Sequence, residues 1–129
     1  MAHSGNHSPA FLALAMSAKA RVTETTVDAV LARRTAGDKF LFVDVREDHE
    51  WAEGHAAGAV HMGRGIIERD IEVAVPDMAA SIVLYCGGGF RSALVADNLQ
   101  KMGYTNVQSM DGGMRAWRAQ NAPVEVPSH

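Results

Sequence analysis

The chain has 129 residues, of which 47% are hydrophobic and 21% charged, and its net charge is -3. This length suits one compact domain, and the composition excludes disordered and fibrous proteins. The negative charge argues against sequence-independent nucleic-acid binding, no apolar run reaches the roughly 18 residues of a membrane span, and a single cysteine excludes a disulfide-stapled secreted scaffold.

The first part of the chain has two competing interpretations. Residues 9–20, PAFLALAMSAKA, are apolar and end in small residues, as in a secretory leader. The residues before them contain no Lys or Arg, so the positive region of a leader is missing. Ser8 and Pro9 are typical of a helix start instead. We therefore predict a helical extension over 1–21, a domain over 22–129 and a cytoplasmic location.

After this extension, strand and helix signals alternate along the chain. We predict strands within residues 21–27, 39–45, 57–62, 80–85 and 105–110. We predict helices within residues 27–37, 46–55, 65–75, 91–102 and 112–120. The runs at 39–45 and 80–85 are continuously apolar, which is typical of strands covered on both faces. In the helix at 91–102, Leu94 and Leu99 lie on an apolar face, and Asp97 lies on the opposite, polar face.

This alternation predicts an α/β fold, with right-handed crossovers and a mainly parallel sheet flanked by helices on both faces. Ligands of such sheets bind outside the carboxyl ends of the strands. Asp44 and Arg46 follow one predicted strand, and Cys86 follows another. The fold rule and the residue pattern therefore indicate the same edge of the molecule.

The only cysteine, Cys86, is followed by three glycines and then by Phe90, Arg91 and Ser92. Consecutive glycines let successive amides turn inward as an anion-binding nest, and the helix that starts near Arg91 adds the positive end of its dipole. Both features favour the nucleophilic thiolate and leave room for an extra sulfur atom. The alternative is a buried, inert cysteine beside a glycine turn.

Cys86, four intervening residues and Arg91 resemble the active-site loop of the rhodanese (sulfurtransferase) family. The segment DVREDHEWAEGHAAGAVHMG, residues 44–63, is similar to the N-terminal signature of that family. The segment GYTNVQSMDGGMRAWRAQNAPV, residues 103–124, is similar to its C-terminal signature. The resemblance covers nearly all of the chain after the N-terminal helix. It implies a stand-alone, single domain with a five-stranded parallel sheet and no cofactor.

The resemblance also implies a two-step sulfur transfer. The Cys86 thiolate takes the outer sulfur of thiosulfate or of a low-molecular-weight persulfide, and a thiol or cyanide then removes it. The implied cradle consists of Gly87, Gly88, Gly89, Phe90, Arg91 and Ser92. Asp44 and Arg46 are implied to brace the loops. Because the chain has no second cysteine, the acceptor comes from outside, and a protein acceptor remains an open alternative.

Two features of the loop concern substrate choice. Arg91 suits two roles. Its guanidinium group can bind an oxyanion substrate, or it can hold the loop closed through a structural contact, and we favour the structural role. The loop interior, residues 87–90, carries no Lys or Arg, so a strong preference for dianionic thiosulfate is not implied. We predict that Arg64, which follows the third strand, supplies positive charge from the same rim.

Two other functions stay open. Phosphatases and arsenate reductases of the same fold also use a Cys-to-Arg loop, but a phosphate-binding loop has five intervening residues and this one has four. A non-catalytic domain that senses sulfide or persulfide, or mediates an interaction, is the second alternative, because a fold does not determine function.

The six histidines do not predict a metal site. His49, His55 and His61 are spaced by six residues, which matches no common zinc-ligand pattern, and only one cysteine could join them. His3 and His7 lie in a polar tail, where we expect no structural role.

Overall fold

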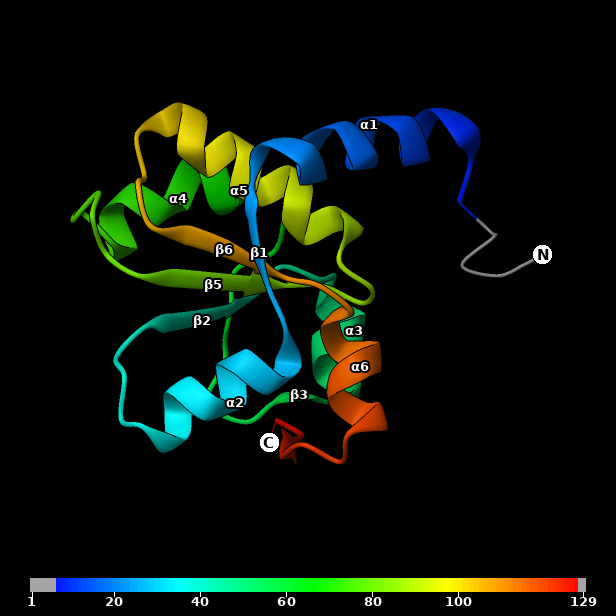
Figure 1. Ribbon diagram of the computed structural model, residues 1–129, viewed down its shortest axis with the longest axis vertical. Helices are drawn as coiled ribbons and strands as arrows, with labels where there is room; N and C mark the ends of the chain where they lie inside the picture. The colour runs from blue at the N-terminus through cyan, green and yellow to red at the C-terminus, as the bar shows by residue number, and fades with distance from the viewer. Residues whose placement is uncertain (1–6, 128–129) are drawn as a thin grey trace.

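A five-stranded parallel sheet forms the centre of the molecule, and helices cover both of its faces (Figure 1). The computed structural model describes residues 7–127. The strand order is β1 (Thr23–Thr25), β6 (Val107–Met110), β5 (Ile82–Tyr85), β2 (Leu41–Asp44) and β4 (Val60–His61), and all neighbours are parallel. The predicted fold class is therefore confirmed.

Each predicted helix is present near its expected place. The helices are α1 (Pro9–Arg21), α2 (Val27–Thr35), α3 (Asp48–Glu53), α4 (Ile67–Ala74), α5 (Phe90–Met102) and α6 (Gly113–Ala119). The sequence did not predict a small antiparallel pair of β3 (His55–Ala56) with β7 (Val124–Glu125), because two-residue strands carry no periodic signal. None of the helices within residues 7–127 combines the length and the apolar character needed to cross a bilayer.

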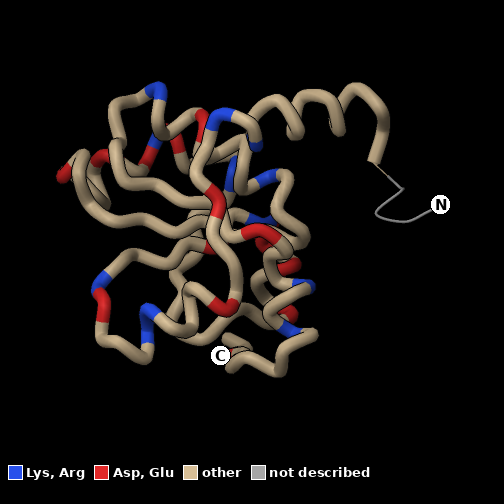
Figure 2. Tube along the Cα trace, in the orientation of Figure 1, with Lys and Arg blue, Asp and Glu red and all other residues tan. Residues whose placement is uncertain are grey.

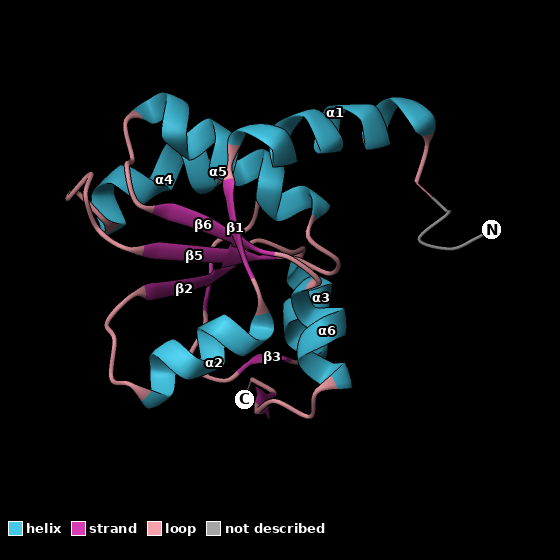
Figure 3. Ribbon diagram, viewed as in Figure 1, coloured by secondary structure: helices cyan, strands magenta, loops and turns pink. Residues whose placement is uncertain are grey.

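The two faces of the sheet carry separate hydrophobic clusters, with α4 and α5 on one side of the sheet and α2 and α6 on the other (Figure 3). Under α4 and α5, Ile71 and Leu99 pack against Leu84 of β5. On the other face, Trp117 of α6 packs with Tyr85, the next residue of the same strand. Side chains of a strand alternate between faces, so one fully buried strand supports both cores.

Helix α1 forms an outer layer along α5 (Figure 1). Ala18 is fully buried against Ala93 and Leu94, and small side chains allow the two helices to approach closely. The Arg21 guanidinium donates hydrogen bonds of 3.2 and 2.7 Å to the Asp97 carboxylate. Asp97, which the sequence placed on a polar face, is only 5% exposed because α1 covers it.

Candidate active site

The carboxyl ends of β2 and β5 lie next to each other, since Asp44 and Tyr85 are paired in register. Cys86 directly follows β5 and is 1% exposed. It belongs to the apolar cluster under α4 and α5, yet it also lines a cavity of about 200 Å³. The cysteine is thus protected from bulk solvent while facing a space in which a small molecule fits.

Polar groups surround the sulfur of Cys86. The amides of Gly89 and Ser92 donate hydrogen bonds to Sγ at 3.1 and 3.4 Å. The hydroxyl of Ser92 lies 3.5 Å from the sulfur and 2.8 Å from the hydroxyl of Ser109, a buried residue of β6. Donors of this kind stabilise a negatively charged sulfur, so the structure provides the environment that a thiolate needs.

Further backbone donors stand beside the sulfur. The amides of Gly88, Phe90 and Arg91 make no hydrogen bond to any group within residues 7–127. Those of Phe90 and Arg91 belong to the first turn of α5, where a helix leaves its amides unpaired. Gly89 precedes that turn with φ 111°, which glycine adopts without strain. The loop therefore holds unused amides next to the sulfur of Cys86.

Backbone amides at the start of α6 donate hydrogen bonds to the cysteine loop. The amide of Met114 donates to the carbonyl of Cys86 at 2.8 Å, and that of Arg115 donates to the carbonyl of Gly87 at 3.0 Å. A Cβ on Gly113 would lie 2.9 Å from the carbonyl carbons of both loop residues, and its φ is 52°. Only glycine fits this contact, which explains the glycine at the first position of α6.

Arg91 ties the loop to helix α3. Its Nη1 and Nη2 donate to the two carboxylate oxygens of Glu50 at 2.7 and 3.0 Å. Hydrogen bonds from Arg91 are the main reason that the pKa of Glu50 falls to about 2. Arg91 also borders the cavity, but its charge is already paired. No local sequence pattern indicates Glu50, because it lies 41 residues from Arg91 in the chain.

Asp44 and Arg46 form a buried ion pair below the site. Arg46 donates from Nε and Nη2 to Asp44 at 3.0 and 2.8 Å, and from Nη2 to the carbonyl of Gly54 at 2.8 Å. The hydroxyl of Tyr85 donates to Asp44 at 2.7 Å, and burial chiefly raises the Tyr85 pKa above its usual range. These bonds join the end of β2 to β5 and to the turn after α3, and neither charged residue lines the Cys86 cavity.

Arg64 does not occupy the rim of the Cys86 cavity, contrary to the sequence-based expectation. It lines a separate cavity together with Glu68 and Asn98. The reason is strand order: β4, which precedes Arg64, lies at the edge of the sheet, and β2 separates it from β5. Two strand spacings amount to roughly 10 Å. The positive charge near Cys86 comes instead from Arg115 of α6, a residue that no sequence pattern indicated.

The N-terminal segment also contributes to the cavity. The lining residues are His7, Phe11, Cys86, Gly88, Phe90, Arg91 and Arg115. The expectation that His7 has no structural role is wrong, because its ring meets the Phe90 ring edge-on at 4.8 Å. His3 lies outside the described residues. No signal in the sequence connects the start of α1 to a loop some eighty residues later.

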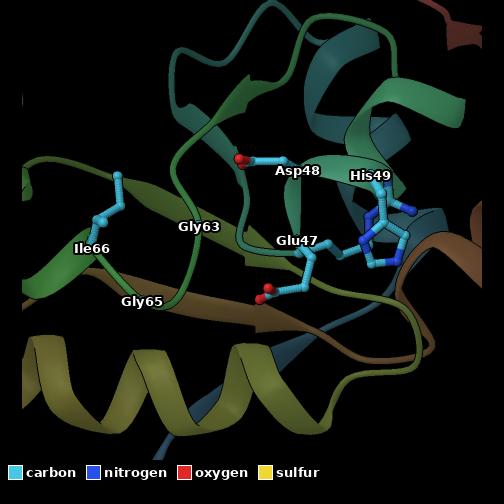
Figure 4. A pocket seen from close by; sticks show the side chains of 7 residues that line it. Glu47, Asp48, His49, Gly63, Gly65 and Ile66 are labelled. Atoms are coloured by element: carbon cyan, nitrogen blue, oxygen red, sulfur yellow. The ribbon is translucent and has the colours of Figure 1, made fainter.

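A larger cavity of about 500 Å³ lies between the loops that follow β2 and β4 (Figure 4). Glu47, Asp48 and His49 line it, but no nucleophilic side chain does. Within residues 7–127, no three His, Cys, Asp or Glu side chains come together as a metal site would require. The smaller cavity is therefore the candidate active site, because the thiol of Cys86 lines it.

Comparisons with known proteins agree with this assignment. Residues 26–120 match the family model described as the Rhodanese-like domain. The chain is 33% identical over 102 residues to YtwF of Bacillus subtilis (strain 168), covering 79% of this chain and 96% of that protein. It is 35% identical over 88 residues to the thiosulfate sulfurtransferase GlpE of Pseudomonas fluorescens (strain SBW25), covering 68% of this chain and 78% of GlpE.

A solved structure matches almost the whole chain. RPA3614 of Rhodopseudomonas palustris CGA009 superposes with a TM-score of 0.81 and 28% identity, covering 97% of this chain and 99% of that chain. That protein is described as one of unknown function and a possible tyrosine phosphatase. The match shows that the shared architecture extends over nearly the full length of the chain.

Proposed function

The chain belongs to the rhodanese-like family of sulfurtransferases, and from this premise we propose that it transfers a sulfane sulfur as a persulfide on Cys86. One observation carries the proposal. The amides of Gly89 and Ser92 donate to the Cys86 sulfur, and that sulfur faces a cavity large enough for a small donor molecule. An inert buried cysteine needs neither feature.

The first step loads the enzyme. The Cys86 thiolate attacks the outer sulfur of thiosulfate or of a small persulfide, forming a sulfur–sulfur bond. The donor's own sulfur–sulfur bond breaks, and sulfite or a thiolate leaves with the electron pair. The terminal sulfur of the resulting persulfide is an anion, and the unused amides of Gly88, Phe90 and Arg91 are suited to bind it.

The second step releases the sulfur. A thiolate or cyanide attacks the terminal sulfur, and the electron pair returns to Cys86 as the thiolate. Cys86 is the only cysteine, so the acceptor comes from another molecule. Each step is a substitution at sulfur, so neither needs an external oxidant or reductant, and neither uses a cofactor. A single thiol fits a reducing compartment, and we place the reaction in the cytoplasm.

Intact-mass spectrometry tests the covalent step. Incubation with thiosulfate or glutathione persulfide should add about 32 Da, the mass of one sulfur on an activated nucleophile. Cyanide should remove this mass and form thiocyanate. Cys86→Ser is the matched variant, since it keeps the size of the side chain and should gain no mass. A wild-type protein that stays unmodified with both donors would contradict the proposal.

Two companion assays separate the alternative functions. Hydrolysis of an aryl phosphate should be absent, because Arg91 is paired with Glu50 and the loop has four residues between Cys86 and Arg91. A sensing domain would accept the sulfur without passing it on. Repeated formation of thiocyanate, in excess of the protein concentration, should therefore be observed, and a single turnover only would favour the sensing function.

A further inference from the structure

The cavity over Cys86 has two walls of different chemistry. We infer, on the basis of the proposed function, that it selects small organic thiols and persulfides that carry a carboxylate. Arg115 binds the carboxylate, and His7 and Phe11 of the N-terminal segment contact the carbon chain beside Phe90. The inference adds to the sulfur-transfer site a substrate class, a residue that selects the carboxylate (Arg115), and two residues that contact the carbon chain (His7 and Phe11).

Arg115 provides the cationic wall. A Cβ built on Gly88 would lie 3.3 Å from Nη1 of Arg115, so the guanidinium stands beside the cysteine loop. Arg91 shares the cavity, but Glu50 already neutralises it. Arg115 makes no ion pair and no side-chain hydrogen bond with any residue from 7 to 127. The planar guanidinium group of Arg115 is thus available to bind a carboxylate, which it matches in shape and charge.

Three rings provide the aromatic wall. The His7 ring meets the Phe90 ring at a centroid distance of 4.8 Å, and the Phe11 ring meets it at 6.5 Å, both edge-on. The His7 and Phe11 rings lie 5.3 Å apart. Lys19 stands over the Phe90 ring, with Nζ 5.6 Å from the centroid. Such mutual contacts restrict ring motion, so the wall is a defined surface for hydrocarbon.

Helix α1 holds this wall in place. The helix has 13 residues and is thus roughly 20 Å long. It runs in the same direction as α5, because Phe11 lies at Phe90 and Arg21 lies at Asp97. Buried Ala18 and the ion pair of Arg21 anchor its second half. The first half carries no Lys, Arg, Asp or Glu (Figure 2), and its Phe11 side chain lines the cavity.

The size of the cavity limits the ligand. Its volume of about 200 Å³ is below the roughly 300–1,000 Å³ of pockets for drug-sized molecules. Thiosulfate would use the positive charge but has no carbon to contact the rings. A short-chain thiol with a carboxylate uses both walls at once, with its sulfur directed at Cys86. This class of molecule fits the observed lining best.

Single-turnover acceptor kinetics test the inference. The Cys86 persulfide is prepared, verified by its mass, and mixed with 3-mercaptopropionate or with the neutral 2-mercaptoethanol. Each rate constant is expressed per thiolate present. We expect the wild-type protein to prefer the carboxylate by about tenfold, as for one partly exposed charge-assisted contact. Arg115→Ala should reduce the ratio to about one, Arg115→Glu should invert it, and Arg115→Lys should retain part of it.

Two further variants complete the design. Arg118→Ala removes another arginine of α6, whose guanidinium lies near Gly54 rather than near Cys86, and should keep the wild-type ratio. Phe11→Ala should slow both thiols severalfold and leave the ratio unchanged. The inference is overturned if the wild-type protein shows no preference, or if Arg115→Ala and Arg118→Ala have the same ratio. Failure to load Cys86 at all would instead contradict the proposed function.

Discussion

Cys86 is 1% exposed, and two backbone amides donate hydrogen bonds to its sulfur. Composition and spacing alone leave two interpretations of such a cysteine, an inert core residue and a nucleophile. A buried sulfur without hydrogen-bond donors around it would favour the inert core residue. Here Gly89 and Ser92 supply donors, and Gly88 stands at the cavity beside the sulfur. At the scale of the residue, the environment is therefore that expected of a nucleophile.

The pair of Arg91 and Glu50 is the side-chain contact that closes the loop. Replacing Glu50 by Gln removes the negative charge and keeps the size. Because both side chains are about a quarter exposed, we expect the free energy of unfolding at neutral pH to fall by only about 1–2 kcal/mol. Loading of Cys86 should also slow, because the loop loses its tie to α3.

The same pair predicts a pH dependence. The folded-state pKa of Glu50, about 2, is below its ordinary 4.5. Its stabilisation is therefore complete above pH 4.5 and is lost as the pH falls toward 2. Urea unfolding of wild type and Glu50→Gln should show a difference that shrinks over this range. Glu53→Gln, on the same helix, serves as the control with a change below about 0.5 kcal/mol. If the difference in free energy of unfolding between wild type and Glu50→Gln were as large at pH 2 as at neutral pH, the ionised pair would be ruled out.

At the scale of elements, the site depends on how α6 begins. Two of its amides bind the carbonyls of Cys86 and Gly87, so the helix positions the loop through backbone contacts alone. Gly113 is the point of closest approach, and its backbone is in the left-handed region. The glycine at the first position of α6 is therefore required for steric rather than chemical reasons.

Gly113→Ala should disturb this contact. The added methyl would collide with the carbonyl of Cys86, and the left-handed φ is unfavourable for alanine. We expect the free energy of unfolding to fall by about 1–3 kcal/mol, together with slower sulfur loading. Gly65→Ala is the matched control, because nothing lies within 4 Å of a Cβ there. Equal thermal stability of the two variants would show that the close approach is not required.

Helix α1 illustrates what an element's own sequence does and does not contain. Residues 9–20 predict a helix through their start signals, and the helix is present. Its position on α5 depends on Ala18 meeting Ala93 and on Arg21 meeting Asp97. Neither contact has a local signature, so the helical extension could be predicted while its contribution to the cavity could not.

At the scale of the whole molecule, one sheet supports two hydrophobic cores. Leu99 belongs to the core under α4 and α5, and Trp117 belongs to the core on the opposite face. Both cores share the central strand β5, whose four residues are all buried. A strand buried on both faces couples the two cores, and we expect the molecule to unfold as a single cooperative unit.

Leu99→Ala tests this coupling. A fully buried leucine leaves a cavity when truncated, so the free energy of unfolding should fall by about 2–5 kcal/mol. Far-ultraviolet circular dichroism and tryptophan emission, measured in a Trp51→Phe background where Trp117 is the remaining tryptophan, should report the same loss, although Trp117 lies on the other face of the sheet. Leu14→Ala, at a position that is 55% exposed, is the control and should change little. Two separated transitions would mean that the cores unfold independently.

Local sequence patterns were sufficient to predict the α/β class, the succession of the helices and of the five strands of the main sheet, and the position of the Cys86 loop. These properties follow from short-range patterns: apolar periodicity, glycines at helix ends, and a thiol followed by glycines at the end of a strand. Asp44 and Arg46 could be expected at the same edge for the same reason.

The side chains that accompany Cys86 at the cavity follow instead from the packing of the folded chain. The strand order separates Arg64 from it, the packing of α3 brings Glu50 to Arg91, and α6 brings Arg115. The layer formed by α1 adds Phe11 to the wall. Each of these outcomes depends on contacts between segments far apart in the chain, and such contacts arise from the combined packing of all elements rather than from any local pattern.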